Sequence, residues 1–398
     1  MVPGAAPILS RVAAIMLAGG QGSRLYELTE QECKPAVRFA GGRRIVDWTM
    51  ANLSGSGLTD LIVATQYRPD TLHRHLQRYW RPAFRQIEIR CGADGAPYRG
   101  TADAVARNID AIDAQSPTEV VVVAADHIYR MDLGQMIAAH RASGARVTVA
   151  ADIVPRAEAR PFGVMHIRGD NRILDFVEKP ADPPAMPGEP DKSLVSMGIY
   201  VFSWRWLRSI LPGAMEAAGS RQDFGHDILP AAVAQGEAAA FPVRKGPAGG
   251  RFYWRDVGTL DAYRRTWLEL EEGVSDCPVP VYPAEADAGP CTLPHVQRLG
   301  SGTPLRRFRD RSNVLLGGTP IPQSARLERA IVAPGAVIPP GLVVGEDPEA
   351  DARWFRVTPG GTTLITPAML SRRSAMRAVR SWPARDAHRA LRKLDRRA

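Results

Sequence analysis

The stretch Thr118–Asp126, TEVVVVAAD, decides the fold, because it is apolar without a break from Val120 to Ala125. A short continuous apolar run that ends in a polar residue is typical of a strand covered on both faces of a parallel sheet. In such sheets the carboxyl ends of the strands meet at one edge, and ligands bind there. We therefore expect the Asp126 carboxylate at a ligand-binding edge.

The segments around this run alternate between strand and helix patterns. Strands are predicted for RVAAIMLA (11–18), TDLIVATQY (59–67) and ARVTVAADIV (145–154). Helical spacing of apolar residues predicts helices for RPDTLHRHLQRYW (68–80), RGTADAVARNIDAI (99–112) and LGQMIAAHRASG (133–144). This alternation ends near Glu272 and predicts an α/β fold with a doubly wound, mostly parallel, Rossmann-like sheet.

The sequence changes character after Asn313, where branched apolar residues recur six apart. Two such series run in parallel, Ile331, Val337, Val343 and Val332, Ile338, Val344, after Leu315, Ile321 and Leu327. A six-residue period predicts a short left-handed parallel β-helix, and a set of surface turns is the alternative. We expect a catalytic domain at 1–275, an irregular linker at 276–312, a shortened β-helix at 313–370 and a basic tail at 371–398.

The composition is that of an ordinary globular protein, with 45% hydrophobic and 23% charged residues. No apolar run approaches the ~18 residues that a membrane span needs, and the N-terminus lacks the basic segment of a signal peptide. The four cysteines, Cys33, Cys91, Cys277 and Cys291, form no CxxC pair. We expect reduced thiols in a cytoplasmic protein without structural zinc.

The net charge of +9 does not indicate a nucleic-acid-binding protein, because it is concentrated at one end. Ten basic and two acidic residues lie between Arg372 and Arg397, so this segment carries nearly the whole excess. A solvated, helical extension is the simpler interpretation of such a charge run, and a polyanion-binding arm is the alternative.

The first predicted strand runs into a glycine-rich loop, MLAGGQGSRL (16–25). A loop without side chains lets backbone N–H groups approach phosphate oxygens, and a helix that starts there adds its positive end. The loop matches neither GxxxxGK[ST] nor GxGxxG. Arg24 and Lys34 add two cations, which suggests a triphosphate whose leaving group must be neutralised.

Further short motifs follow this loop in a fixed order. They are CKPAV (33–37), PYRGTADAV (97–105), ADHIY (125–129), FGVM (162–165), FVEKP (176–180), SMGIYVF (196–202), DFGHDILP (223–230) and YWRDVGT (253–259). Together they closely resemble the bacterial glucose-1-phosphate adenylyltransferase (ADP-glucose pyrophosphorylase) family from Val12 to Gly258. The resemblance resumes at AIVAPGAVIPPG, which begins at Ala330, and fades near Leu370. The resemblance implies a nucleotidyltransferase domain followed by a left-handed β-helix.

The resemblance also implies the reaction, in which glucose 1-phosphate attacks the α-phosphate of ATP and pyrophosphate leaves. The product, ADP-glucose, would serve glycogen or related glucan synthesis. Because the sugar phosphate is already a competent nucleophile, the protein must supply cations and alignment rather than a strong base. The implied cofactor is Mg²⁺, and the implied assembly is a homo-oligomer, a tetramer in the family.

The resemblance assigns roles to individual residues. Arg24, Lys34 and Asp126 would be catalytic, and Asp126 and Asp256 would hold the metal. The implied sugar-phosphate ligands are Tyr98, Gly163, Glu178, Lys179, Ser196 and Asp223. The implied nucleotide contacts are Leu17, Ala18, Gly19, Gly20, Gly22, Ser23 and Gly100. His127 and His226 have no matched partner ligands, and we do not interpret them as metal ligands.

Four departures from the family pattern affect these expectations. The stretch Ile87–Tyr98 is short and lacks the Gln-Gln pair that reads adenine, and Ala125 replaces a glycine, where its β-carbon is expected to crowd the nucleotide. Gln31 and Glu32 replace a Lys-Arg pair linked to sugar-phosphate activators, which argues against that activator chemistry. The β-helix is also shortened, which affects expectations about regulation and assembly.

Two further functions stay open at the level of the sequence. The same chemistry with another nucleoside triphosphate fits the missing glutamines. A non-catalytic regulatory paralogue fits these losses too, although the retained charged residues argue against it. A hexapeptide acyltransferase does not fit, because the repeats are few and carry no candidate catalytic histidine.

Overall fold

The computed structural model describes residues 9, 11–92, 95–243, 253–273, 277–286 and 312–380. Within these ranges, nine strands form one mixed sheet in the order β10-β9-β11-β6-β1-β4-β5, with β8 paired to β11 and β12 paired to β8. The strands are β1 (Val12–Ala18), β4 (Asp60–Thr65), β5 (Gln86–Cys91), β6 (Glu119–Ala124), β8 (Val147–Pro155), β9 (Gly163–Ile167), β10 (Ile173–Glu178), β11 (Lys192–Ser203) and β12 (Ala238–Pro242).

The sheet has a parallel part and an antiparallel part. Strands β5, β4, β1 and β6 run parallel, with Ile15 opposite both Ile62 and Val122. Strand β11 then runs antiparallel to β6, β8 and β9. The predicted strand at 145–154 is therefore present as β8, but its neighbour β11 runs the other way. The parallel part contains the glycine loop and Asp126, so their expected common edge is retained.

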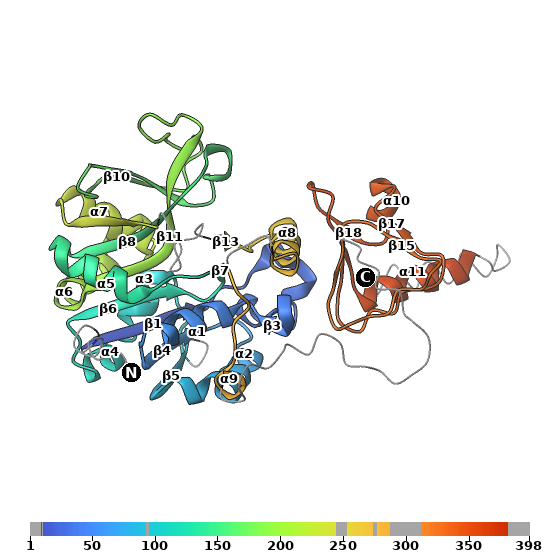
Figure 1. Ribbon diagram of the computed structural model, residues 1–398, viewed down its shortest axis with the longest axis horizontal. Helices are drawn as coiled ribbons and strands as arrows, with labels where there is room; N and C mark the ends of the chain where they lie inside the picture. Colours follow the sequence, from blue (N-terminus) through green and yellow to red (C-terminus); the bar gives the residue numbers. More distant parts are fainter. Residues whose placement is uncertain are drawn as a thin grey trace.

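Helices cover both faces of the sheet (Figure 1). On one face lie α1 (Val46–Gly55), α2 (Asp70–His75) and α5 (Leu133–Ser143); on the other lie α3 (Thr101–Ala106), α4 (Ile109–Ala114), α6 (Trp204–Glu216) and α7 (Leu229–Ala234). The packing of β6 explains its continuous apolar run. Val121 and Val123 pack in the core cluster on the face of α1, and Val120 and Val122 pack in the core cluster on the face of α3. A strand with both faces buried needs apolar residues at every position.

The helix predicted at 99–112 is divided into α3 and α4. The break is at Asn108, whose backbone has φ −117° and ψ 19°. Its side-chain amide donates to the Ala104 carbonyl at 2.6 Å, a local bond that competes with the helical pattern. The predicted helix is therefore interrupted between the end of α3 and the start of α4.

Short elements complete the catalytic part. They are β2 (Arg38–Phe39), β3 (Arg43–Arg44), β7 (His127–Tyr129), β13 (Trp254–Asp256), α8 (Leu260–Glu271) and α9 (Pro283–Ala286). Strand β13 pairs antiparallel with β7, which follows β6 directly, and Asp256 lies opposite His127. This pairing brings Asp256 of the YWRDVGT motif close to Asp126, although 129 residues separate the two aspartates in the sequence.

The C-terminal part is a short parallel β-helix. Its elements are β14 (Val314–Leu315), β15 (Arg326–Leu327), β16 (Ala330–Val332), β17 (Val343–Val344), α10 (Pro348–Ala352), β18 (Arg356–Val357), β19 (Thr363–Ile365) and α11 (Pro367–Arg380). Val314 pairs with Ile331, and Arg326 pairs with Val343, both in parallel register. The two pairs share a spacing of 17 residues, close to three six-residue repeats, so the predicted β-helix is confirmed.

The two six-residue series do not share one face. Val332, Ile338 and Val344 pack into the interior of the β-helix. In the other series Ile331 faces the catalytic part, and Val337 is 81% exposed. The six-residue period does not say which series points inward, and the structure shows that Val337 points outward, because successive side chains on a strand point to opposite sides.

The two parts of the molecule share a buried apolar cluster, which we call the joint cluster. It combines Leu25, Leu28, Phe39, Trp48 and Leu260 of the catalytic part with Val314, Leu316, Ile331, Ala333 and Leu364 of the β-helix, among others. Figure 1 shows α8 on the side of the catalytic part that faces the β-helix strands. Polar contacts join the same surfaces, since Thr358 donates to Asp261 at 2.7 Å and Arg264 donates to Thr362 at 3.1 Å.

Two expectations about the outer segments have different outcomes. Within the part of the chain that the structure describes, no helix is both long and apolar enough to cross a membrane. The basic tail begins in α11, and its residues 381–398 lie outside the described residues, as do most of the expected linker and Cys291. The domain boundaries expected from the sequence therefore stay predictions.

Candidate active site

A cavity of about 610 Å³ lies at the carboxyl edge of the parallel strands. Residues that follow β1, β4 and β6 line it, as the position of ligand sites in such sheets predicts. Of the residues expected from the sequence, it is lined by Leu17, Ala18, Gly19, Gly20, Gly22, Ser23, Arg24, Lys34, Tyr98, Gly100, Asp126, Glu178, Lys179 and Asp223. Segments far apart in the chain are thus brought to one cavity.

The glycine loop has its bare backbone for two different reasons. Gly22 has φ +70°, and a β-carbon there would lie 2.7 Å from Cβ of Lys34, so both conformation and space require glycine. A β-carbon on Gly20 would meet nothing within 4 Å, so that position leaves room in the cavity. The loop therefore combines a tight turn against Lys34 with an open stretch beside it.

No α-helix begins at this loop, contrary to our expectation of a positive helix end there. The loop continues into a 3₁₀ segment, Ser23–Thr29, with a kink at Tyr26 (φ 52°, ψ −125°). The kink interrupts the repeating backbone geometry that would align peptide dipoles. Positive charge at the loop consequently comes from side chains, chiefly those of Arg24 and Lys34.

Lys34 is the centre of the charged group. Its ammonium lies 2.9 Å from a carboxylate oxygen of Asp126 and 2.9 Å from one of Asp256. The Lys34 side chain is only 6% exposed, whereas that of Asp126 is 35% exposed. A buried ammonium needs such partners, because an unpaired charge is costly to remove from water.

These contacts shift the two pKa values in opposite directions. Burial alone would lower the pKa of Lys34, but attraction to Asp126 and Asp256 outweighs it and raises that pKa above its ordinary value. Burial alone would raise the pKa of Asp126, but Lys34, and His127 to a lesser extent, lower it strongly. Asp126 therefore stays a carboxylate over the whole physiological pH range.

Arg24 is held more loosely than Lys34. Its side chain is 60% exposed, and its guanidinium lies 3.9 Å from Asp256. Gly258 makes this approach possible, since a β-carbon there would lie 2.9 Å from both the Arg24 guanidinium and the Asp256 carboxylate. The arrangement leaves Arg24 free to contact an anion in the cavity.

A second group of polar side chains lies across the cavity. Lys179 donates to Glu178 at 2.7 Å, at the end of β10. Asp223 accepts from the hydroxyl of Thr101 at 2.8 Å and from the backbone of Gly225 at 2.9 Å. Carboxylates fixed in this way can accept hydrogen bonds from the hydroxyls of a polar ligand.

Three of the expected residues do not line this cavity. Gly163 lies beneath it, where a β-carbon would be 2.3 Å from the ring of Phe176 and 2.8 Å from Glu178. Ser196 is buried and donates to the hydroxyl of Tyr200, which does line the cavity. Asp256 reaches the cavity only through Lys34 and Arg24, and lines a neighbouring cavity instead.

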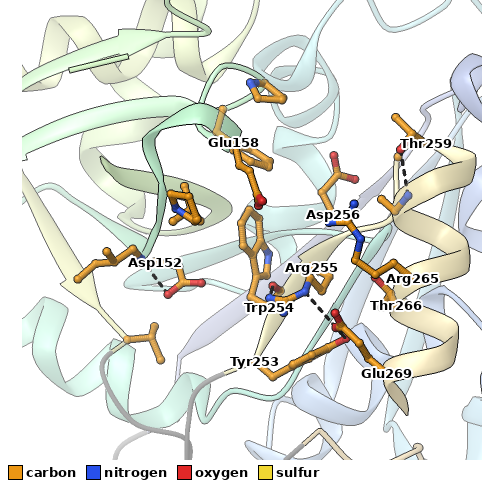
Figure 2. A pocket seen from close by; sticks show the side chains of 18 of the residues that line it. Asp152, Glu158, Tyr253, Trp254, Arg255, Asp256, Thr259, Arg265, Thr266 and Glu269 are labelled. Atoms are coloured by element: carbon orange, nitrogen blue, oxygen red, sulfur yellow. Dashed lines mark hydrogen bonds and ion pairs between the residues drawn. The ribbon is translucent and has the colours of Figure 1, made fainter. Parts of the chain in front are cut away.

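That neighbouring cavity, of about 770 Å³, lies on the other side of Asp256 (Figure 2). Figure 2 shows Trp254 at its centre, with Arg255 linked to Glu269 of α8. The two cavities share Arg24 and Gly258. The segment that contains Asp256 therefore lies between the two cavities.

The histidines are better placed than we expected from the sequence. His127 lies with Asp126 and Asp256, and His226 lies with Glu178 and Asp223, each group having ligand atoms within 4.8 Å of one another. Asp126 and Asp223 are close to these histidines in the sequence, whereas Asp256 and Glu178 are brought to them by the fold. The interpretation that neither histidine is a metal ligand stays a prediction. The first group surrounds a site already favourable for a cation, since Lys34 holds its ammonium there.

Several polar residues that line the cavity were absent from our expectations, among them Gln66, Thr101 and Tyr200. Gln66 follows β4, and its amide both accepts from and donates to the backbone of Tyr98. Gln66 lies at the carboxyl end of the strand predicted at 59–67, and this position at the common edge was a signal that the sequence offered.

The departures from the family pattern have local explanations. Ala125 is fully buried in the core, so its β-carbon points away from the cavity and the expected crowding is wrong. Glu32 accepts from Arg44 at 2.9 Å, and Gln31 is exposed. Part of the stretch expected to read adenine, residues 93 and 94, lies outside the described residues.

Comparison with known proteins identifies the family. A nucleotidyl transferase model matches residues 13–273, and a GlmU-like C-terminal hexapeptide model matches residues 309–365, in agreement with a left-handed β-helix. The glucose-1-phosphate adenylyltransferase of Roseobacter denitrificans is 41% identical over 92% of this chain and 98% of its own length. Those of Rhodopseudomonas palustris (strain TIE-1) and Jannaschia sp. are 40% and 39% identical, over 93% and 92% of this chain and 99% and 98% of theirs.

The chain belongs to the glucose-1-phosphate adenylyltransferase family. Nucleotidyl transferases generally use a divalent metal ion. The donors present fit one, because carboxylate oxygens such as those of Asp126 and Asp256 are the preferred ligands of hard divalent cations. In this member of the adenylyltransferase family, the ammonium of Lys34 lies between those two carboxylates.

Proposed function

We propose that this protein transfers the adenylyl group of ATP to glucose 1-phosphate, giving ADP-glucose and pyrophosphate, with Mg²⁺ as the metal ion. The observation that carries the proposal is the Lys34 ammonium held by Asp126 and Asp256 beside the bare glycine loop. A cation-holding pair next to a loop open to phosphate suits a nucleoside triphosphate. The relatives at about 40% identity carry the name of this activity.

In this proposal the nucleotide lies along the glycine loop. The open space at Gly20 admits phosphate groups close to the backbone, and Arg24 and Lys34 neutralise their charge. Asp126 and Asp256 hold the metal ion, which when bound would draw electrons from the phosphates and offset the charge of the leaving pyrophosphate. Leu17, Ala18, Gly19, Ser23 and Gly100 complete the nucleotide side.

Glucose 1-phosphate occupies the opposite side of the cavity. Lys179 would meet its phosphate, and Glu178 and Asp223 would accept from sugar hydroxyls. A phosphate oxygen of the sugar then attacks the α-phosphorus of ATP while the bond to the bridging oxygen of pyrophosphate breaks. No proton has to move, so alignment and charge neutralisation supply the rate enhancement.

Tyr98, Gly163 and Ser196 take smaller parts in the proposal. The hydroxyl of Tyr98 accepts from Asn108 at 3.1 Å and can still donate to a ligand. Gly163 keeps Glu178 and Phe176 in place by its lack of a side chain, and Ser196 acts through Tyr200. We further propose a homo-oligomer, a tetramer as in the family, in the cytoplasm; the three described cysteines are free.

The test is to incubate the protein with Mg²⁺, glucose 1-phosphate and each of ATP, UTP, GTP, CTP and dTTP, and to measure pyrophosphate release. We expect release with ATP and loss of at least about 10²-fold in Asp126→Asn, which keeps the shape and removes the charge. Lys192→Met, a change in a surface ion pair far from the cavity, is the control. If pyrophosphate is released only with another nucleotide, that nucleotide is the substrate and the proposal for ATP is wrong. If the protein binds glucose 1-phosphate but turns over no nucleotide, it is a regulatory paralogue.

A further inference from the structure

Arg356 of the β-helix contacts the segment that carries Arg24. It stands at the start of β18, and its Nε donates to both carboxylate oxygens of Glu27, at 3.0 and 2.7 Å. A second guanidinium nitrogen also donates to Glu27. The guanidinium lies 4.2 Å from the ring centroid of Tyr26, within the range of a cation–π contact. One arginine thus holds two successive residues of another part of the molecule.

The residue under the guanidinium has a strained backbone. Tyr26 has φ 52° and ψ −125°, a region that residues with a β-carbon rarely adopt. Such a conformation costs about 1–3 kcal/mol and persists only when surrounding contacts impose it. Thr29 supplies one of these contacts, since its hydroxyl lies 3.0 Å from the Tyr26 carbonyl and 3.2 Å from that of Gly22. Arg356 adds contacts from outside the segment.

The kink decides where Arg24 points. Arg24 is two residues before Tyr26, and among the described residues the ion pair found for its exposed side chain is the loose 3.9 Å one with Asp256. The backbone on its N-terminal side is fixed by Gly22, and on its C-terminal side Leu25 is buried in the joint cluster. We propose that Arg356 is a positioning residue, which holds the Tyr26–Glu27 turn and thereby aims Arg24 into the cavity.

A surface ion pair without functional effect is the alternative, because exposed pairs contribute little. Three features separate Arg356 from such a pair. Its contact with Glu27 is forked, its plane covers an aromatic ring, and its partner Glu27 is mostly buried. These contacts also explain the pKa of Glu27: burial acts to raise it, but the hydrogen bonds from Arg356 reverse this and lower it below the ordinary value.

The chain offers a matched control. Arg326 donates to Glu346 at 2.7 and 3.3 Å within the β-helix, so this pair is also an arginine–glutamate fork. Both of its side chains are more exposed than those of Arg356 and Glu27. Among the described residues, the side-chain hydrogen bonds and ion pair found for Arg326 and Glu346 are those that join them to each other. Arg326→Ala therefore removes the same chemical contact without touching the Tyr26–Glu27 turn.

The experiment is a double-mutant cycle on the full chain, and it depends on the proposed function for its rate measurement. The variants are Arg356→Ala, Arg356→Lys, Arg24→Ala, the double variant with both alanines, and Arg326→Ala. We expect Arg356→Ala to lower kcat/KM for ATP about tenfold, since small displacements of a catalytic group are costly. Arg356→Lys should recover little, because an ammonium cannot fork. Arg326→Ala should leave kcat/KM unchanged.

The decisive comparison is made in the Arg24→Ala background. If Arg356 acts through Arg24, its substitution there has no further effect on kcat/KM. An equal tenfold loss in both backgrounds overturns the proposal, as does wild-type activity of Arg356→Ala. KM for glucose 1-phosphate serves as a second control and should not change.

A measurement without turnover separates this proposal from the proposed function. Amide hydrogen exchange of residues 22–30 in the full chain reports whether the turn is held. We expect faster exchange there in Arg356→Ala and not in Arg326→Ala. If the wild-type protein releases no pyrophosphate but shows this difference, the reaction is wrong and the positioning contact remains. Unchanged exchange in Arg356→Ala overturns the positioning contact whatever the activity.

Discussion

At the scale of single residues, the site is organised by one buried charge. The Lys34 ammonium lies between Asp126 and Asp256, and Gly22 must lack a β-carbon to let the Lys34 side chain pass. Because the ammonium occupies the space between the two carboxylates, it stands where a divalent cation would find the same oxygens. If Asp126 and Asp256 hold the metal ion as we propose, lysine and metal would compete for one set of ligands.

This competition makes a prediction for Lys34→Met. Without the ammonium two carboxylates face each other, so we expect the metal-free variant to lose about 2–3 kcal/mol of stability, a value reduced by the partial exposure of Asp126. Added Mg²⁺ should then raise Tm in the variant more than in the wild type. Thermal unfolding with and without MgCl₂ measures both effects, with Lys192→Met as the surface control. An equal Mg²⁺ response in all three proteins would contradict the shared-ligand view.

At the scale of elements, helix α5 packs on β8 through a buried histidine. His140 lies 2.8 Å from the hydroxyl of Thr148 on β8 and 3.3 Å from that of Ser203 on β11. Burial, chiefly, lowers the pKa of His140 to about 4. The neutral ring can exchange hydrogen bonds with the two hydroxyl groups. A protonated ring would lose its hydration at this buried position, which disfavours the charged form.

The expected result is a loss of stability in acid that depends on this ring. Between pH 6.5 and about 4 the unfolded chain binds a proton at His140 and the folded chain does not, so the free energy of unfolding falls as pH falls. The slope from this group approaches about 1.4 kcal/mol per pH unit within that window. Denaturant unfolding of wild type and His140→Gln at several pH values measures it. The variant should show a flatter profile, and identical slopes would refute the assignment.

At the scale of the whole molecule, the β-helix is part of the catalytic architecture. The joint cluster buries Leu25, next to Arg24, together with Leu364 of β19. Arg356 holds the same segment from its exposed side, and Thr358 holds Asp261 of α8. Both cavity-lining segments, the one after the glycine loop and the one after Asp256, thus rest on the C-terminal part.

A pair of truncations tests this dependence. Leu364→Ala should cost about 2–5 kcal/mol by leaving a cavity in the joint cluster, and it should raise KM for ATP because Leu25 loses support. Val337→Ala, at the exposed position of the same β-helix, should change stability by less than about 0.5 kcal/mol. Tm and steady-state kinetics of the two variants provide the measurement. A Leu364→Ala protein with lower Tm and unchanged KM would separate stability from the site.

Sequence patterns predicted much of this arrangement where the evidence was local. The apolar run of β6 placed Asp126 at the sheet edge, and the glycine loop after β1 placed Gly20 and Gly22 there. Patterns did not determine a side chain's direction where it depends on distant packing: Ala125 faces the core, and Val337 faces solvent. His127 and Gln66 were missed as residues near the site because Asp256 and Tyr98, which lie beside them, are distant in the sequence.

The sequence by itself determined the alternation of strands and helices, the six-residue repeat and the family, since these depend on periodicity and on order along one chain. Only the tertiary structure decided that Lys34 joins Asp126 to Asp256 and that Arg356 holds the turn beside Arg24. The physical reason is that burial and pairing of charge depend on distances through space, and residues hundreds of positions apart have no pattern in common until the chain folds.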